Sequence, residues 1–215
     1  MKEISPYPIK PRCEVTVPGS KSYTHRILIA SALSDGMCRI ENALISEDTL
    51  LTMDALRQMG IQIDNQPGNL LHVSGGGGTL VPKQDRIFLG NSGTSMRLLT
   101  AVAALGQVTV TLEGTDRMGQ RPIHDLIEAL TQIGVRIYST NRNGCPPVEI
   151  HGGPVKGGEV AIDCRASSQY LSALLLIAPY TIDGLDITVV EGPVSRPYVD
   201  MTVAVMADFG VAVQR

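Results

Sequence analysis

The chain has 215 residues, of which 43% are hydrophobic and 18% charged, and its formal net charge is −3. That size suffices for one large domain or two small ones with a real core. No basic run points to nucleic acid, no apolar stretch is long enough to span a membrane, and the four cysteines form no CxxC pair, so we expect a cytoplasmic protein without a metal or disulfide framework.

The predicted elements are short strands with two-residue alternation and helices that carry apolar stretches. In chain order they are strand 14–17, helix 27–33, helix 48–59, strands 61–63 and 70–73, strand 86–89, helix 96–105, strand 107–112, helix 122–133, strands 135–137 and 148–150, strand 159–162, helix 170–177, strand 185–190, helix 197–209 and strand 211–213. The fold class is therefore α/β.

Three glycines indicate an internal repeat of roughly 75 residues. Gly60, Gly134 and Gly210 each follow a predicted helix and open an alternating strand. Glycine takes the left-handed conformation at a helix end at little cost. The repeating unit is predicted to be βαβαββ, with units at about 13–75, 84–152 and 158–215. We expect the third unit to be truncated, because the chain stops where its last strand should begin.

The first helix of each unit is apolar all round, which indicates burial inside the fold while the sheets face solvent. Each of these helices follows a polar junction, at residues 18–22, 90–94 and 165–169. Ser, Asn and Thr side chains there can accept hydrogen bonds from the free N–H groups of the first helical turn. Taken alone, each junction is as readily explained by a capped turn as by a ligand site.

Cationic side chains cluster near these junctions: Lys21, Arg26, Arg97, Arg117, Arg121, Arg165 and Arg196. Helix N-termini attract anions through their free N–H groups and the helix dipole. The pattern therefore predicts a site for a phosphate or carboxylate ligand. It is not a nucleotide-binding P-loop, because Ser20 rather than glycine precedes Lys21.

Five ordered motifs resemble the 5-enolpyruvylshikimate-3-phosphate synthases over nearly the whole chain. They are residues 18–22 with Arg26, residues 89–94 with Arg97, residues 117–123, residues 167–169 and residues 195–200. The resemblance implies an enolpyruvyl-transferase-like domain of three βαβαββ repeats around a pseudo-threefold axis. Ser92 and Leu98 depart from the family, in which many members have Ala and Pro at these positions.

The resemblance also implies a reaction and a set of ligand-binding residues. The enolpyruvyl group of phosphoenolpyruvate would move to the 5-hydroxyl of shikimate 3-phosphate, with release of phosphate and with no metal or organic cofactor. The expected shikimate 3-phosphate ligands are Lys21, Ser22, Arg26, Ser167, Ser168, Gln169, Ser195 and Tyr198. The expected phosphoenolpyruvate ligands are Lys21, Asn91, Gly93, Arg121 and Gln169, and Lys21 is the catalytic candidate.

Members of this family are about twice as long, so the resemblance implies an N-terminal half. Residues 1–12 would form a strand of the other domain, and residues 13–215 the N-terminal domain. We expect this half alone to be inactive, to require the C-terminal half as its partner, and to act as a monomer when complete. Two alternatives remain open, namely a UDP-N-acetylglucosamine enolpyruvyl transferase and a non-catalytic module that binds phosphate ligands.

Overall fold

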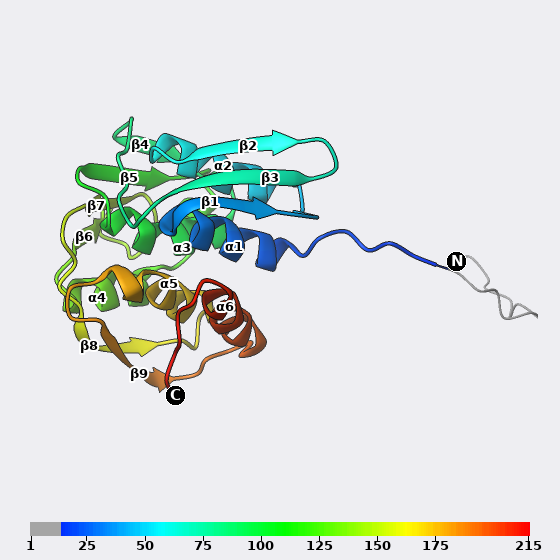
Figure 1. The fold of residues 1–215 in the computed structure, drawn as a ribbon. Helices are drawn as coiled ribbons and strands as arrows, with labels where there is room; N and C mark the ends of the chain where they lie inside the picture. The colour runs from blue at the N-terminus through cyan, green and yellow to red at the C-terminus, as the bar shows by residue number, and fades with distance from the viewer. Residues whose placement is uncertain (1–13) are drawn as a thin grey trace, which may run out of the picture.

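The computed structural model describes residues 14–215, so the strand expected within residues 1–12 lies outside the described part. Figure 1 shows three groups of strands on the outer sides of the molecule, with the helices packed between them. Each group belongs to one of three successive units of the chain. This confirms the α/β fold and its repeat.

The second unit contains every element of the predicted βαβαββ pattern. Its elements are β4 (Arg86–Phe88), α3 (Gly93–Ala104), β5 (Thr109–Glu113), the 3-10 helix η1 (Met118–Gln120), α4 (His124–Gln132), β6 (Arg136–Ser139) and β7 (Val148–His151). The sheet order is β4-β5-β7-β6. Strand β4 runs parallel to β5, and β7 runs antiparallel to both β5 and β6.

The first and third units follow the same order with fewer strands. The first has α1 (Lys21–Leu33), β1 (Asp35–Ile40), α2 (Glu47–Gln58), β2 (Gln62–Gln66) and β3 (Leu70–Gly76), in sheet order β1-β3-β2. The third has β8 (Gly158–Asp163), α5 (Gln169–Ile177), the 3-10 helix η2 (Ala178–Tyr180), β9 (Leu185–Glu191) and α6 (Pro197–Asp208), with β8 parallel to β9.

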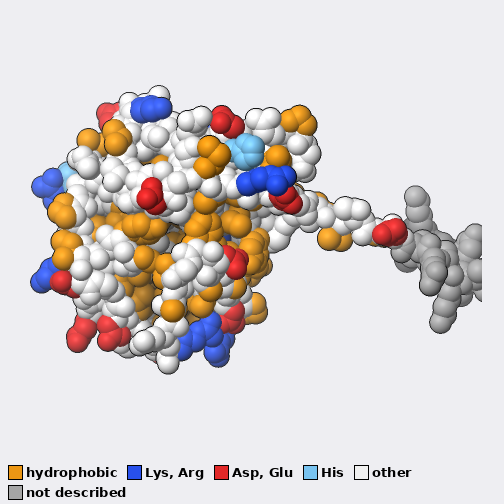
Figure 2. Space-filling view, viewed as in Figure 1, with side chains coloured by type: hydrophobic (Ala, Val, Ile, Leu, Met, Phe, Trp, Pro, Cys, Tyr) orange, Lys and Arg blue, Asp and Glu red, His pale blue; other side chains and the backbone are white. Residues whose placement is uncertain are grey.

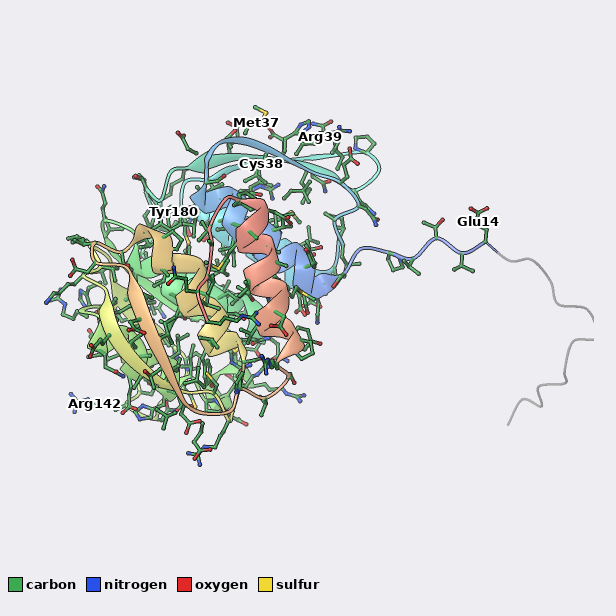
Figure 3. All side chains as sticks on the ribbon, turned by 60° about the horizontal axis from the view of Figure 1, so that its bottom comes forward. Glu14, Met37, Cys38, Arg39, Arg142 and Tyr180 are labelled. Atoms are coloured by element: carbon green, nitrogen blue, oxygen red, sulfur yellow. The ribbon has the colours of Figure 1, made fainter. Side chains whose placement is uncertain are left out.

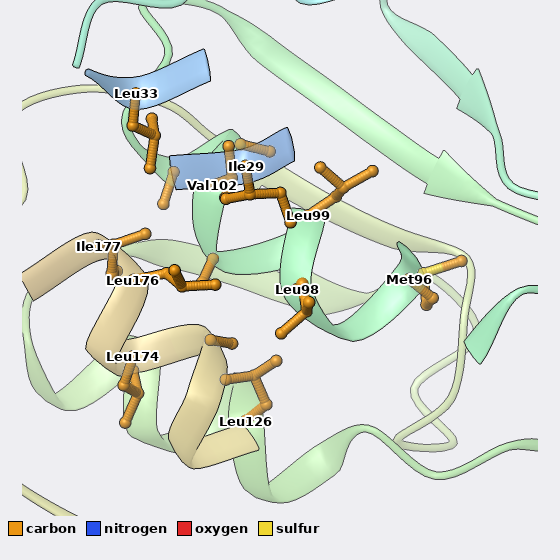
Figure 4. Close-up of a cluster of buried hydrophobic side chains, with 14 of the residues drawn as sticks. Ile29, Leu33, Met96, Leu98, Leu99, Val102, Leu126, Leu174, Leu176 and Ile177 are labelled. Atoms are coloured by element: carbon orange, nitrogen blue, oxygen red, sulfur yellow. The ribbon is translucent and has the colours of Figure 1, made fainter. Parts of the chain in front are cut away.

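The core forms where the apolar helices of the three units meet. Helix α3 packs against α1 and α5, and all eight residues from Tyr170 to Ile177 are buried. Figure 4 shows Ile29 and Leu33 of α1 beside Leu99 and Val102 of α3, with Leu176 of α5 close by. The expectation that these helices lie inside is confirmed, because a helix with no polar face gains most by burying its whole surface.

The helix ends agree with the glycine pattern. Gly60, Gly134 and Gly210 follow α2, α4 and α6 with φ values of +98°, +93° and +79°. These φ values lie in the left-handed region that a side chain rarely enters, so glycine ends each helix without strain.

Two predicted strands are wrong. Residues 14–17 and 211–213 have the right alternation but no strand structure. Figure 3 shows Glu14 in a segment that leads away from the body of the molecule, and Val15 is 77% exposed. A strand needs a neighbour to satisfy its backbone hydrogen bonds, and neither segment has one within the described chain.

The third unit leaves an apolar groove of about 780 Å³ beside β9 and α6. Its lining includes Leu171 and Leu175 of α5, Ile187 and Val189 of β9, and Val203 of α6. Figure 2 shows hydrophobic side chains gathered on the face over α5 and α6. The C-terminal segment turns back along α6, where Arg215 Nη2 lies 2.6 Å from Asp200 Oδ1.

Candidate anion-binding site

The N-termini of α1 and α3 are capped as the sequence predicts. Ser20 Oγ accepts a hydrogen bond from the backbone N–H of Tyr23, and Ser92 Oγ accepts one from Ser95. Helix α5 differs, because Ser168 at its N-cap position makes no side-chain cap bond within the described structure. Instead Ser167 Oγ accepts from the N–H of Gln169 at 3.2 Å.

Lys21 lies at the start of α1 and pairs with a carboxylate that the sequence analysis did not single out. Its Nζ is 2.7 Å from Oδ2 of Asp48, in the first turn of α2, and its side chain is half exposed. Partial burial opposes ionisation of Asp48, but the hydrogen bond and charge of Lys21 outweigh it and hold the pKa of the carboxyl below its usual value. The Lys21 ammonium therefore has one fixed partner, the Asp48 carboxylate, and two further N–H donors.

Gln169 joins the N-termini of α3 and α5. Its Oε1 accepts from Arg97 Nη1 at 2.9 Å, and its Nε2 donates to Thr94 Oγ1 at 3.0 Å. The Arg97 guanidinium also lies over the ring of Tyr170, 5.5 Å from the centroid. Burial lowers the pKa of Arg97, although arginine stays charged at neutral pH. The amide of Gln169 therefore holds two helix starts together.

Arg121 covers the start of α3. Its Nη1 donates to the backbone carbonyl of Asn91 at 3.1 Å. A Cβ added to Gly93 would lie 2.2 Å from Arg121 Nη2, well inside van der Waals contact. Glycine at this position is thus what allows a guanidinium to rest against the first N–H groups of the helix. The structure brings Asn91, Gly93 and Arg121 together.

Arg26 is a buried hub. It is 1% exposed, and it donates through Nε to Thr202 Oγ1, through Nη2 to Ser172 Oγ and through Nη1 to the carbonyl of Ser22. Three of its five donors are thus used within the protein. Burial lowers the pKa of Arg26 to about 10, so it is still cationic at pH 7.

Tyr198 and Ser195 lie at the start of α6 near this hub. The Arg26 guanidinium is 5.8 Å from the centroid of the Tyr198 ring, and the backbone N–H of Tyr198 donates to the carbonyl of Ser195. Ser195 is exposed with a φ of +54°, an uncommon conformation for a residue with a side chain. Its neighbour Val194 donates to the carbonyl of Cys164, which ties this loop to the junction before α5.

The predicted residues therefore form two neighbouring groups. One surrounds the start of α3 and contains Asn91, Gly93, Arg121 and Gln169; the other surrounds Arg26 and contains Ser22, Ser195 and Tyr198. Lys21 is linked to the first group through Asp48, whose backbone carbonyl oxygen lies 3.3 Å from Ser95 Oγ. Ser167 and Ser168 are buried at the start of α5.

Sequence reasoning missed Asp48 and the position of His25. The predicted helix 48–59 already places Asp48 in a first helical turn, and Ser46 caps this helix in a reciprocal pair with Thr49. Nothing local indicates that this turn faces Lys21. Among residues 14–215, no group of three or more His, Cys, Asp or Glu side chains converges as a metal site, and no helix has the length and apolar character to cross a bilayer.

A repeated βαβαββ unit with apolar first helices inside, and with cations at the helix N-termini, defines a domain of the enolpyruvyl transferase fold. A family model described as EPSP synthase (3-phosphoshikimate 1-carboxyvinyltransferase) matches residues 8–215. The chain belongs to this family.

The relatives agree with that assignment. The 3-phosphoshikimate 1-carboxyvinyltransferase of Methanothermobacter thermautotrophicus is 44% identical over 199 residues, which cover 93% of this chain and 46% of the relative. That of Nitrosomonas europaea is 43% identical over 94% of this chain and 47% of its own length. The solved EPSP synthase from Acinetobacter baumannii superposes with a TM-score of 0.81 at 31% identity, over 94% of this chain and 44% of that structure. The chain thus spans about half the length of the relatives it matches.

Proposed function

We propose that this chain supplies one half of the active site that transfers the enolpyruvyl group of phosphoenolpyruvate to the 5-hydroxyl of shikimate 3-phosphate, with release of phosphate. The observation that carries the proposal is the grouping of Lys21, Arg97 and Arg121 around the N-termini of α1 and α3. Two substrates with several negative charges need such donors, and each charge-assisted hydrogen bond contributes roughly 1.5–3 kcal/mol.

Phosphoenolpyruvate is assigned to the group at the start of α3. Arg121 supplies a fork of N–H donors suited to a carboxylate or phosphate, and the backbone of residues 91–93 supplies further donors. Lys21 adds a point charge from the neighbouring helix, and Gln169 lies between the two groups. Lys21 is proposed to contact both substrates.

Shikimate 3-phosphate is assigned to the group around Arg26. The two remaining donors of Arg26, with Lys21, meet the charge of the phosphate, and the hydroxyls of Ser22, Ser167, Ser168, Ser195 and Tyr198 suit the phosphate oxygens and ring hydroxyls. Arg26, Ser167 and Ser168 are buried, and their interactions are strengthened because the local dielectric is lower than that of water.

The complementary half of a full-length relative is the proposed partner. The side chain of Lys21 is half exposed and Tyr198 is 42% exposed, so Lys21 acts at high dielectric and holds ligands weakly in this chain. Chemistry also needs groups that protonate the phosphoenolpyruvate methylene and accept the hydroxyl proton, each worth roughly 10²–10⁴-fold. Asp48 is the one carboxylate hydrogen-bonded to a proposed ligand residue among residues 14–215, and it is held as the partner of Lys21.

Phosphate release tests the function. We expect none from this chain alone with phosphoenolpyruvate and shikimate 3-phosphate, and robust release when a separately produced C-terminal half from a close relative is added. Replacing the acceptor with UDP-N-acetylglucosamine should abolish release. Activity with that acceptor instead would identify the related transferase. Calorimetry then compares shikimate 3-phosphate with inorganic phosphate: equal affinities, with no turnover in any mixture, would indicate a phosphate-binding module.

A further inference from the structure

A line of buried polar side chains lies behind Lys21. His25 Nδ1 is 2.8 Å from Thr52 Oγ1, Thr52 Oγ1 is 2.7 Å from Ser95 Oγ, and Ser95 Oγ is 2.7 Å from Ser92 Oγ. The Ser92 side chain in turn acts on the Asp48 carboxyl and contributes to its lowered pKa. The line crosses from α1 to α2 to α3 and ends at the residue that holds Lys21.

His25 carries a single ring proton at neutral pH. It is 0% exposed, and burial lowers its pKa to about 4, although the charge of Asp48 opposes this. Its Nε2 has no hydrogen-bond partner among the described residues. The one proton must therefore sit either on Nδ1, where Thr52 can accept it, or on Nε2, where nothing described here can.

The two tautomers orient the whole line in opposite directions. With the proton on Nε2, that buried N–H is left unpaired, and Thr52 must donate back to Nδ1, so the serine hydroxyls turn away from Asp48. With the proton on Nδ1, each hydroxyl can donate to the next, and the Ser92 hydroxyl is left free to donate to the carboxylate. Unpaired buried N–H groups are rare, whereas an unpaired acceptor is better tolerated, so the second arrangement is favoured.

We propose that His25 is a positioning residue: as the Nδ1–H tautomer it starts a one-way hydrogen-bond chain through Thr52, Ser95 and Ser92 that orients the Asp48 carboxylate, and Asp48 holds the Lys21 ammonium at the anion site. The side chain of Lys21 is flexible and half exposed. An Asp48 carboxylate that is held in one orientation restricts the positions that the Lys21 ammonium can take. The role of Lys21 toward substrate rests on the proposed function, but the hydrogen-bond chain does not.

The tautomer is the first test. Imidazole ¹⁵N chemical shifts of this chain at pH 7 distinguish a protonated from an unprotonated ring nitrogen. We expect His25 to be protonated at Nδ1 and not at Nε2. A proton on Nε2 would overturn the proposal, whatever the chain does with substrates.

The second test titrates the Asp48 carboxyl by ¹³C NMR in this chain. Thr52→Val removes the hydroxyl at nearly constant shape, and we expect it to raise the pKa of Asp48, as Ser95→Ala should. Thr100→Val is the matched control, because Thr100 is also buried but its hydroxyl donates to the carbonyl of Met96 in its own helix. An unchanged Asp48 titration in Thr52→Val refutes the hydrogen-bond chain.

Substitutions at His25 test the donor directly. The amide of Asn can donate as Nδ1–H does, so His25→Asn should keep the Asp48 titration of the wild type, whereas His25→Leu should shift it as Thr52→Val does. Equal shifts in both would mean that the loss of packing, not of the donor, is responsible. Unfolding curves for each variant identify conditions in which it is folded.

Calorimetry with shikimate 3-phosphate then links the chain to binding. We expect Thr52→Val to weaken binding roughly tenfold, within the range by which residues that do not touch a ligand modulate its affinity, and Thr100→Val to leave it unchanged. If the wild-type protein fails to bind while the Asp48 titration shifts in the variants as expected, the proposed function fails and the hydrogen-bond chain stands. If the wild type binds and Thr52→Val binds equally well, the positioning role fails.

Discussion

At the residue scale, Gly93 is required by the position of Arg121. A methyl group at residue 93 would overlap the guanidinium, which must then leave the start of α3. Because Arg121 is flexible and partly exposed, we expect Gly93→Ala to change stability by less than about 1 kcal/mol. In the active mixture of the two halves, Gly93→Ala should raise the KM for phosphoenolpyruvate, because the displaced guanidinium of Arg121 no longer donates to the ligand. Gly153→Ala, where an added Cβ meets nothing within 4 Å, is the control and should leave KM unchanged. Wild-type KM in Gly93→Ala would contradict this assignment.

His25 gives a second prediction at this scale, a dependence of stability on pH. Its pKa is about 4 when folded, against its ordinary 6.5, so the unfolded chain binds more protons between these values. The stability that neutral His25 provides is present above pH 6.5 and is lost as pH falls toward 4. The loss is about 3 kcal/mol relative to a residue that does not titrate. Urea unfolding of the wild type and of His25→Asn at several pH values should show that the difference between their free energies of unfolding changes by that amount. A difference independent of pH would mean that His25 is not held neutral.

At the element scale, α5 contributes by being buried on every side. Leu174 is 0% exposed in the core shown in Figure 4, whereas Leu50 on α2 is 41% exposed. Removing a buried leucine side chain loses transfer free energy and leaves a cavity, so Leu174→Ala should lower the free energy of unfolding by about 2–5 kcal/mol. Leu50→Ala should cost less than about 1 kcal/mol. Denaturant unfolding measures both, and equal small effects would show that α5 is not part of the core.

At the scale of the whole molecule, the third unit lacks the antiparallel strand pairing that the other two have within the described residues. Strands β1 and β5 pair antiparallel with β3 and β7, whereas β9 has β8 as its single neighbour among residues 14–215. We expect hydrogen exchange to be faster in residues 185–191 than in residues 109–113. Addition of the complementary half should slow exchange at 185–191 and leave 109–113 unchanged. Equal protection of both strands before addition, or no change after it, would count against a partner that covers this side.

Local chemistry in the sequence determined most of the elements and half of the site. Gly60, Gly134 and Gly210 end helices because only their own backbone conformation is involved, and Ser20 and Ser92 cap helices because their partners lie three residues away. The apolar pattern of residues 170–177 likewise requires burial wherever the helix packs.

Tertiary structure decided whatever needs a partner distant in the chain. Residues 14–17 and 211–213 alternate as strands do, yet they remain irregular because no neighbouring strand takes up their backbone hydrogen bonds within the described residues. The ion pair of Lys21 with Asp48 spans 27 residues, and the contact of Arg26 with Thr202 spans 176. No local pattern encodes such pairings, because they exist only once the helices of the three units have packed against one another.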